Sequence, residues 1–441
     1  MKNILIIPGT TDLNRGDQTL LWESIEVARD IYPDSSVFLY ESGVNDKEKF
    51  LQRRQTAKKG YVFLERILQH PRRFDNNTKV NYGVLTLLKW GLISIWDLMR
   101  TSLLISRINV VRQLGYKLLS DDQKHTCDAI ASMDLVIVKG GGFLHSYGKI
   151  RDAYLMYYFL FDIKLAQRLN KKVVVLPNSI GPLKNSIARF IVKHVLLKCV
   201  FVSTRENVSQ KFVSQKLNVN GYLSPDLGFY QKASEIDLKN ELVSLGVDFS
   251  KKRVALTLRP YRFDGNKNAN ELYEKYIMEM TKLIDLLTQN GIQVSLVKHT
   301  LGPSAHEDDT IALNEVYERL EDKASVIVLG NDDWDCQQLQ RVYSYYDFLI
   351  GTRFHSVIYA LNMKVPCIAI AYGGNKSYGI MKDIGVEQYV VPIEKVTSGR
   401  IFELFEQLCA SKNEYVNKLE KYQAKLINER NDLINNIKQC I

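Results

Sequence analysis

The chain has few of the residues that build cross-linked or metal-stapled domains. Only six of its 441 residues are cysteines, and no two are close enough to form a CxxC or zinc pattern. This spacing argues against a disulfide scaffold, and no His/Cys/Asp cluster at ligand spacing predicts a metal. We therefore expect free thiols in a reducing cytosol. The cysteines are Cys127, Cys199, Cys336, Cys367, Cys409 and Cys440.

Low-complexity segments are also missing. Ten prolines and 25 glycines are too few for such a chain, and the 46% hydrophobic and 24% charged residues are ordinary for a globular protein. The composition therefore excludes disordered and fibrous classes. The apolar start at residues 4–7 is stopped by Pro8 and Gly9, which predicts a buried strand rather than a signal peptide. At roughly 150 residues per domain, the length predicts two or three domains.

Positive charge is in excess and is concentrated in one stretch. The formal net charge is +10, and residues 46–79 carry ten basic and four acidic residues, a net +6. No recognition helix, zinc finger or aromatic RNA-binding pattern accompanies them, so we expect no nucleic-acid partner.

The most apolar stretch follows at residues 84–108. Lys89, Asp97 and Arg100 interrupt it, so no uncharged run approaches the roughly 20 residues of a membrane span. On a helix these charges share one face, because Asp97 and Arg100 lie about 80° and 20° from Lys89. Two interpretations stay open. The helix packs on the body of the protein, or it lies in a membrane interface where the basic stretch attracts anionic lipid.

Apolar strands alternate with helices along the rest of the chain, which predicts parallel sheets covered on both faces. Strands are expected at residues 4–7, 36–40, 134–139, 172–176, 200–203, 254–258, 293–298, 326–329, 348–350 and 367–371. Helices are expected at residues 17–31, 121–132, 153–169, 186–198, 271–290, 312–320, 335–344, 356–361 and 403–441.

The two series of strands predict an α/β protein with two doubly wound, Rossmann-like domains that face a cleft. The expected domains are residues 1–235, with an insertion at about 46–110, and residues 236–400. Residues 401–441 are expected to form a helical tail.

Glycine-containing turns follow two of the strands. Asn14 and Gly16 stand where the first helix opens, and a helix N-terminus favours an anion. The alternative there is a plain turn with an Asp helix cap. Gly140, Gly141 and Gly142 follow residues 134–139 and predict a loop that needs backbone freedom or presents bare amides to a ligand.

Polar residues stand at further strand ends. Ser179 follows residues 172–176 and offers a hydroxyl at the edge of the sheet. Arg205 either binds a carboxylate or phosphate, or pairs with Glu206 on the surface. Arg259, at the end of a later strand, could likewise bind an anion or have a structural role. His299 either contacts a ligand or is structural.

The most specific cluster is GTRFHS, between a strand and an apolar helix. Arg353 offers a rigid fork for an anion, and His355 can exchange a proton near neutral pH. We therefore predict that both are catalytic and that Ser356 contacts substrate. Tyr372 and Lys376 flank a glycine loop after the next strand, where a cation could hold a phosphate.

Taken together, these motifs resemble the polysaccharide pyruvyl transferases. The resemblance spans about residues 3 to 395 and rests on NxGD, GGG, SxGP, VSTRE and above all GTRFHSVIYALNMKVPCIAIAYGGNKSYG. It implies a GT-B-like enzyme that moves a pyruvyl group from phosphoenolpyruvate to a sugar, usually as a cyclic ketal. Arg353 and His355 match the family's catalytic Arg-x-His. Arg205 and Arg259 are its candidate further anion-binding arginines, and the choice between them stays open.

The implied chemistry assigns roles to these residues. Arginines, Lys376 and glycine-loop amides would hold the carboxylate and phosphate of the donor. His355 would act as general acid or base, and Arg353 would stabilise the departing phosphate. Asp17 is a candidate for orienting the acceptor hydroxyl. No cofactor is expected beyond phosphoenolpyruvate as donor substrate.

The acceptor implied by the resemblance belongs to a surface polysaccharide, such as a capsule or exopolysaccharide, or to its lipid-linked precursor. We expect a cytoplasmic protein. Whether residues 46–110 also make a peripheral contact with the inner face of the membrane stays open, as do the two interpretations of the apolar stretch. Two rivals stay open. One is a glycosyltransferase that uses a nucleotide sugar, for which Glu387 could bind the ribose, and the other is a non-catalytic glycan- or membrane-binding relative.

Overall fold

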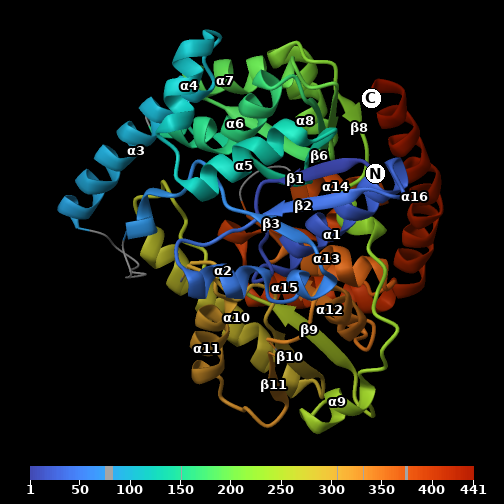
Figure 1. Ribbon diagram of the computed structural model, residues 1–441. Coiled ribbons are helices and arrows are strands. Elements are labelled where there is room, and N and C mark those ends of the chain that lie inside the picture. The colour runs from blue at the N-terminus through green and yellow to red at the C-terminus, as the bar shows by residue number, and fades with distance from the viewer. Residues whose placement is uncertain (75–82, 150, 305, 331, 373–375) are drawn as a thin grey trace. The chain divides into compact units, whose positions relative to one another are not determined.

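The computed structural model describes residues 1–74, 83–149, 151–304, 306–330, 332–372 and 376–441, which form two compact units (Figure 1). Unit 1 comprises Met1–Asp12, Leu20–Leu227 and Asn428–Ile441, and unit 2 comprises Leu13–Thr19 and Gly228–Ile427. The domain limits expected at residues 235 and 400 stay a prediction.

Unit 1 is built on a parallel sheet, which has eight strands in the described chain. Its strand order is β3-β2-β1-β4-β6-β7-β8, and β5 pairs with β6. The strands are β1 (Asn3–Ile7), β2 (Ser36–Tyr40), β3 (Val62–Leu64), β4 (Leu135–Val138), β5 (Gly141–Ser146), β6 (Lys172–Leu183), β7 (Phe201–Thr204) and β8 (Tyr222–Leu223). The central strands are buried along their length, as expected of a sheet with helices on both faces.

The helices of the first half of the chain connect these strands. They are α1 (Arg15–Ile31), α2 (Asp46–Arg53), α3 (Val84–Leu104), α4 (Asn109–Lys117), α5 (Asp121–Ser132), α6 (Asp152–Arg168), α7 (Ser186–Leu196) and α8 (Asn207–Phe212). Their ends follow local chemistry. In α5, for example, Ser120 and Gln123 form a reciprocal capping box.

Unit 2 repeats the plan with a six-stranded parallel sheet of order β11-β10-β9-β12-β13-β14 in the described chain. Its strands are β9 (Arg253–Thr257), β10 (Gln293–Val297), β11 (Val326–Leu329), β12 (Phe348–Gly351), β13 (Cys367–Ala371) and β14 (Val390–Pro392). The helices of the second half of the chain are α9 (Lys239–Ser244), α10 (Ala269–Gln289), α11 (Asp309–Arg319), α12 (Cys336–Tyr343), α13 (Phe354–Asn362), α14 (Lys376–Ile384), α15 (Ser398–Ala410) and α16 (Lys412–Cys440).

The predicted fold class is confirmed, because both sheets are parallel and both strand orders are of the Rossmann type. One local prediction is wrong. Gly141 and Gly142, expected in a loop, begin strand β5, and β6 continues past its expected end so that Ser179 lies within it. The two segments pair with each other, Gly141 opposite Asn178, and this pairing keeps both backbones extended.

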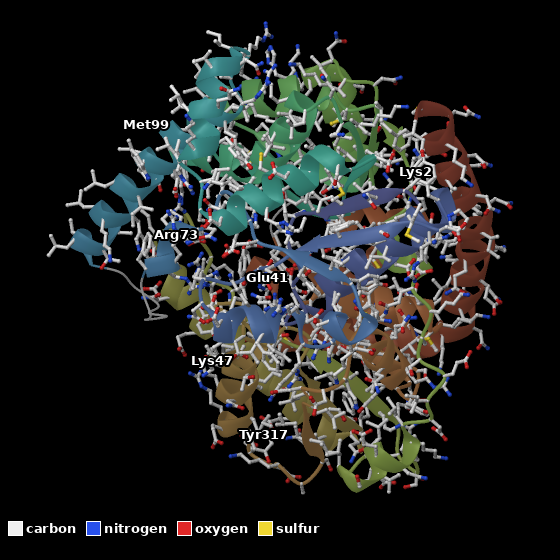
Figure 2. All side chains as sticks on the ribbon, viewed as in Figure 1. Lys2, Glu41, Lys47, Arg73, Met99 and Tyr317 are labelled. Carbon is white, nitrogen blue, oxygen red and sulfur yellow. The ribbon has the colours of Figure 1, made fainter. Side chains whose placement is uncertain are left out.

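The expected insertion contains α2, β3, α3 and the start of α4. α3 packs on unit 1, but it does so through its polar side. Asp97 and Thr101 are fully buried, whereas Leu92 is 71% exposed. Figure 2 shows Met99 on the outer side of α3 and Arg73 on the side toward the rest of unit 1. Within the described chain, none of the helices combines the length and apolarity needed to cross a bilayer.

Candidate active site

The candidate site lies at the carboxyl edge of the unit 2 sheet. The strand order reverses between β9 and β12, since β10 and β11 lie on one side and β13 and β14 on the other. In open parallel sheets, ligands bind outside the carboxyl ends of the strands at this switch point. Arg259 follows β9, Arg353 follows β12, and His299 and Tyr372 follow β10 and β13. The topology therefore gathers the predicted residues of unit 2 at one edge.

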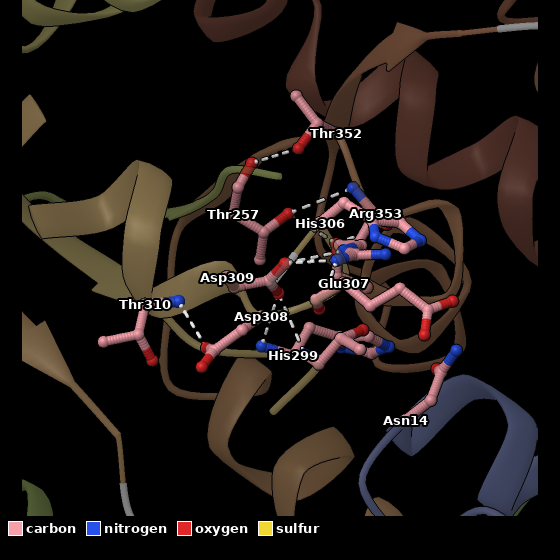
Figure 3. A network of polar contacts seen from close by, with 12 residues as sticks. Asn14, Thr257, His299, His306, Glu307, Asp308, Asp309, Thr310, Thr352 and Arg353 are labelled. Carbon is pink, nitrogen blue, oxygen red and sulfur yellow. Dashed lines mark hydrogen bonds and ion pairs between the residues drawn. The ribbon is translucent and has the colours of Figure 1, made fainter. Parts of the chain in front are cut away.

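Arg353 stands at the N-cap position of α13, and its side chain is held by a buried carboxylate (Figure 3). Its Nε donates to Asp309 Oδ1 at 2.7 Å, and its Nη2 donates to the Glu307 carbonyl at 2.7 Å. Burial alone would lower the pKa of Arg353, but the Asp309 carboxylate more than offsets burial and the pKa is raised. Nη1 makes no hydrogen bond to any described residue. A rigid, charged fork with one uncommitted nitrogen suits a carboxylate or phosphate.

Asp309 is a residue that the sequence did not single out. It is fully buried in the first turn of α11, and its Oδ2 accepts from the backbone N–H groups of His299 at 3.0 Å and Thr300 at 2.9 Å. One carboxylate thus joins Arg353 to the segment after β10. An acid in the first turn of a helix ordinarily complements the helix dipole, so its sequence position alone gave no sign of this role.

His355 lies in the first turn of α13, half-buried, and its ring packs against the backbone at Gly16. A Cβ on Gly16 would overlap His355 Nδ1 and would lie 2.8 Å from the His355 Cβ. Gly16 is therefore required for space, because any side chain there would displace the imidazole.

His299 is 1% exposed and packs against Tyr359, with ring centroids 5.1 Å apart. Burial lowers its pKa well below the usual value, and the charges of His355, Arg353 and Arg15 act in the same direction. Its ring is therefore neutral near pH 7, and Nε2 is buried without a hydrogen-bond partner in the described chain. Such a nitrogen can exchange one hydrogen bond with a ligand but cannot supply charge.

Asn14 caps α1. Its Oδ1 accepts from the Gly16 N–H at 3.1 Å, and its Nδ2 donates to Asp17 Oδ2 at 3.0 Å. The alternative of an Asp helix cap is therefore wrong. The backbone of Asn14 also bridges to Thr300, so the start of α1 and the site share a scaffold within unit 2. Asp17 stays half-buried beside this cap.

Arg259 differs from Arg353 because no carboxylate pairs with it in the described part of the chain. Its guanidinium lies 4.1 Å from the ring centroid of Tyr372 and 5.6 Å from that of Tyr261. Its Nε is buried and has no hydrogen-bond partner among the described residues. Lys376, at the start of α14, lies over the ring of Phe354 at 5.1 Å.

Ser356 is fully buried. Its Oγ pairs with Thr257 Oγ1 at 2.8 Å and donates to the Arg353 carbonyl at 2.5 Å. This hydroxyl ties the end of β9 to the start of α13. The predicted contact of Ser356 with substrate stays a prediction.

His306 is another residue that sequence analysis did not identify. It is half-buried, and its pKa is lowered by burial and by Arg262, with a smaller effect of Arg259. Its Nε2 lies 3.4 Å from the hydroxyl oxygen of Ser304. The sequence EDD around it resembles an ordinary polar loop, so nothing marked it.

The remaining predicted residues belong to unit 1. Among them, the positive charge of Arg205 is compensated by carboxylates of the protein. Its Nη1 donates to the buried Asp226 at 2.7 Å, its Nε donates to Ser179 Oγ at 2.7 Å, and Glu206 lies 3.8 Å away. Arg205 is 5% exposed, so the predicted surface pair with Glu206 is wrong in its location. Of the two candidate arginines, Arg259 has the charge left for an anion.

None of the three glycines of unit 1 has a positive φ, and two of them, Gly140 and Gly142, leave little space for a side chain. A Cβ on Gly142 would lie 2.9 Å from Arg205 Nη2, and one on Gly140 would lie 3.1 Å from the Pro177 carbonyl. Gly141 and Gly142 lie in β5, and Gly142 leaves room for the Arg205 guanidinium. Their predicted contact with substrate stays a prediction.

No group of three His, Cys, Asp or Glu residues in the described chain has the arrangement of a metal site.

A family model described as "Polysaccharide pyruvyl transferase" matches residues 14–374. The amylovoran biosynthesis protein AmsJ of Erwinia amylovora is 27% identical over 285 residues, which cover 62% of this chain and 65% of AmsJ. The chain thus spans about two thirds of that relative's length.

Solved structures share the fold. The UDP-GlcNAc 2-epimerase of Neisseria meningitidis bound to UDP-GlcNAc has a TM-score of 0.57 at 10% identity, covering 100% of both chains. UGT89C1 of Arabidopsis thaliana complexed with quercetin has a TM-score of 0.52 at 11% identity, covering 100% of this chain and 99% of that one. S. aureus MnaA with UDP has a TM-score of 0.51 at 10% identity, covering 95% and 91%. At these identities, the likeness concerns the fold alone.

Proposed function

Because this chain belongs to the polysaccharide pyruvyl transferase family, we propose that it transfers a pyruvyl group from phosphoenolpyruvate to a sugar of a surface polysaccharide or its precursor. The relative AmsJ is named for the biosynthesis of amylovoran, and this supports an acceptor of that class. The proposed product is a cyclic ketal.

One observation carries the donor assignment. Arg259, Arg353 and Lys376 follow neighbouring strands at the switch point of the unit 2 sheet, and Arg259 has no carboxylate partner in the described chain. Phosphoenolpyruvate has a carboxylate and a phosphate, so its recognition requires several cations at one place. We propose that Arg259, Arg353 and Lys376 together bind the carboxylate and the phosphate of phosphoenolpyruvate.

The proposed reaction balances as follows. The methylene carbon of phosphoenolpyruvate takes a proton, and two acceptor hydroxyls bond in turn to the neighbouring carbon. The bond from that carbon to the phosphate oxygen breaks, and inorganic phosphate leaves. Of the two protons that the hydroxyls release, one balances the new methyl group and the other leaves with phosphate.

His355 is the proposed general acid and base of this sequence, and Asp17 is the proposed residue that orients the acceptor hydroxyl. Arg353 would stabilise the charge on the departing phosphate. Because His299 is neutral and buried, we assign it one hydrogen bond to the donor and no proton transfer. Since phosphoenolpyruvate is a cytoplasmic metabolite, the proposed reaction takes place in the cytoplasm.

The test is thermal stabilisation of the purified chain by phosphoenolpyruvate, beside a panel of nucleotide sugars. A ligand that binds only the native state raises the melting temperature. We expect a shift with phosphoenolpyruvate that is lost in Arg259→Ala, which removes a cation without leaving a buried acid unpaired. Arg319→Ala is the matched control, because Arg319 pairs with Glu274 at the surface of α11. A shift with nucleotide sugars alone would instead make the chain a glycosyltransferase.

A further inference from the structure

α3 is fixed in one orientation by a buried polar network. Both carboxylate oxygens of Asp97 accept from Arg73, at 2.7 and 3.0 Å, and Oδ1 also accepts from Arg100 Nε at 2.9 Å. Arg100 in turn donates to Gln123 Oε1 at 2.8 Å, and the Thr101 hydroxyl pairs with that of Tyr157 at 2.8 Å. Breaking such a network would leave a buried charge unpaired, so α3 cannot roll over to hide its other side.

That other side is apolar and exposed, the reverse of an ordinary surface helix. Leu88 is 61% exposed, Leu92 71% and Trp96 52%. The neighbouring helix α4 continues the surface with Val110 at 68% and Leu114 at 51%. We call this surface the outer apolar face. It consists of Leu85, Leu88, Leu92, Ile95, Trp96 and Met99 of α3 and Val110 and Leu114 of α4.

Within the segment that forms the outer apolar face, the exposed charges are basic, and the exposed acids Asp121 and Asp122 follow only at the start of α5. Residues 83–118 hold five basic residues and one acidic residue, and the acidic residue is the buried, paired Asp97. Arg107 and Lys117, next to the exposed residues of α4, are themselves exposed. A face that is apolar with a cationic border complements an anionic lipid surface.

The basic stretch before α3 contributes less than its sequence predicted, because many of its charges are paired internally. Lys49 and Arg53 both pair with Glu41, Arg66 with Asp162, and Arg72 with Glu48. Lys47, Lys58 and Lys59 of that stretch stay exposed. On the segment that carries the outer apolar face, attraction to lipid falls to the exposed Lys89, Arg107 and Lys117.

A hollow of about 540 Å³ opens beside α3, and Leu92, Trp96 and Leu118 form part of its wall. The apolar part of this wall suits the end of an acyl chain, and the two arginines in the wall, Arg73 and Arg100, are paired with Asp97. The indole of Trp96, apolar with one polar N–H, is a side chain that favours the boundary between headgroups and hydrocarbon.

From these contacts we propose that the outer apolar face lies in the interfacial layer of an anionic bilayer, with α3 and α4 resting on the membrane. The proposal names the membrane partner of the proposed enzyme, but its evidence is a surface of unit 1 and does not depend on pyruvyl transfer. A binding measurement without substrate therefore tests it apart from the proposed function.

The experiment is co-sedimentation of the full chain with phosphatidylcholine vesicles, with and without phosphatidylglycerol. We expect retention on the phosphatidylglycerol vesicles, weakened by salt. The double variant Leu88→Asp/Leu92→Asp is expected to lose at least about tenfold in the partition coefficient, because two exposed leucines no longer enter the interface. Ile427→Asp on α16 is the matched control, since Ile427 and Leu92 are equally exposed at 71%.

Equal retention of the wild type and the double variant, or no retention of either, would overturn the proposal. A second result would also overturn it: the wild type is a dimer in sedimentation velocity, the double variant is a monomer, and neither binds vesicles. The outer apolar face would then be an interface between two copies of the chain. A circular dichroism spectrum shared by all variants ensures that the comparison concerns binding rather than folding.

Discussion

At the scale of single residues, the candidate site consists of functional side chains that are held by others. Arg353 is oriented by Asp309, and His355 occupies space that Gly16 leaves open. Each supporting residue is replaceable without touching the proposed donor. Substitutions can therefore distinguish residues that position a side chain from residues that contact the proposed donor, and two predictions follow.

The first concerns the buried ion pair. Arg353→Ala leaves Asp309 buried and without its ion-pair partner, so we expect a loss of about 3–5 kcal/mol in the free energy of unfolding. Asp309→Asn keeps the shape and removes the charge that positions Arg353. We expect at least a tenfold loss of kcat for pyruvyl transfer with a smaller change in KM, on the order of the effect of one misplaced group. Urea unfolding measures the change in stability, and steady-state kinetics measure the change in kcat. If Arg353→Ala were as stable as the wild type, the proposed stabilising role of the Arg353–Asp309 ion pair would be wrong.

The second concerns glycine. Gly→Ala within a helix ordinarily stabilises by about 1 kcal/mol. Gly399 is the second residue of α15, as Gly16 is of α1, and no atom lies within 4 Å of a Cβ placed there. We therefore expect Gly399→Ala to be fully active and Gly16→Ala to lose activity through displacement of His355. Phosphate release from phosphoenolpyruvate with a cell-envelope extract measures this, and equal activity of the two variants would refute it.

At the scale of elements, most strands of the two sheets and many of the helices that cover them could be predicted from apolar runs and helix caps. β2, β11, β13 and α5 have the bounds that were expected. The errors arise where a tertiary contact overrides local composition. Gly141 lies in a strand because β6 pairs with it. α14 (Lys376–Ile384) was missed because the sequence Gly-Gly-Asn, which lies outside the described residues, stands directly before it.

The same limit applies to the site. Arg353 and His355 were predictable because a rigid cation and a titrating ring stand two residues apart at a strand end. Asp309 was not, because its partner Arg353 is 44 residues away in sequence. The preference for Arg259 over Arg205 likewise depends on Asp226, which only the folded chain brings to Arg205.

The contact between α1 and α16 within unit 1 predicts a pH dependence. Burial raises the pKa of Glu23 from 4.5 to about 7, although Arg430 acts in the opposite direction at 3.2 Å. The unfolded chain therefore loses this proton at lower pH than the folded chain, and stability falls as pH rises from 4.5 to about 7.

We expect Glu23→Gln to remove that part of the slope, which amounts to about 3 kcal/mol at most. Urea unfolding of both proteins between pH 4 and pH 8, about the window of the shift, measures it. Parallel stability curves for the wild type and Glu23→Gln would contradict the assignment of the raised pKa to Glu23.

At the scale of the whole molecule, the fold places the chain among many proteins with two Rossmann-like sheets, some of which are named for UDP or a UDP-sugar. Fold therefore cannot choose between nucleotide-sugar chemistry and pyruvyl transfer. Family membership and the cations after β9, β12 and β13 favour pyruvyl transfer. The expected cleft between domains stays a prediction.

The most direct test follows the pyruvyl group itself. Purified protein is incubated with phosphoenolpyruvate, radiolabelled in its carbon skeleton, and with an envelope extract of a strain that lacks the gene. The account predicts label in the polysaccharide or its precursor, released by mild acid as pyruvate, and no label with His355→Gln. Label that enters equally with His355→Gln, or that enters only from a nucleotide sugar, would contradict it.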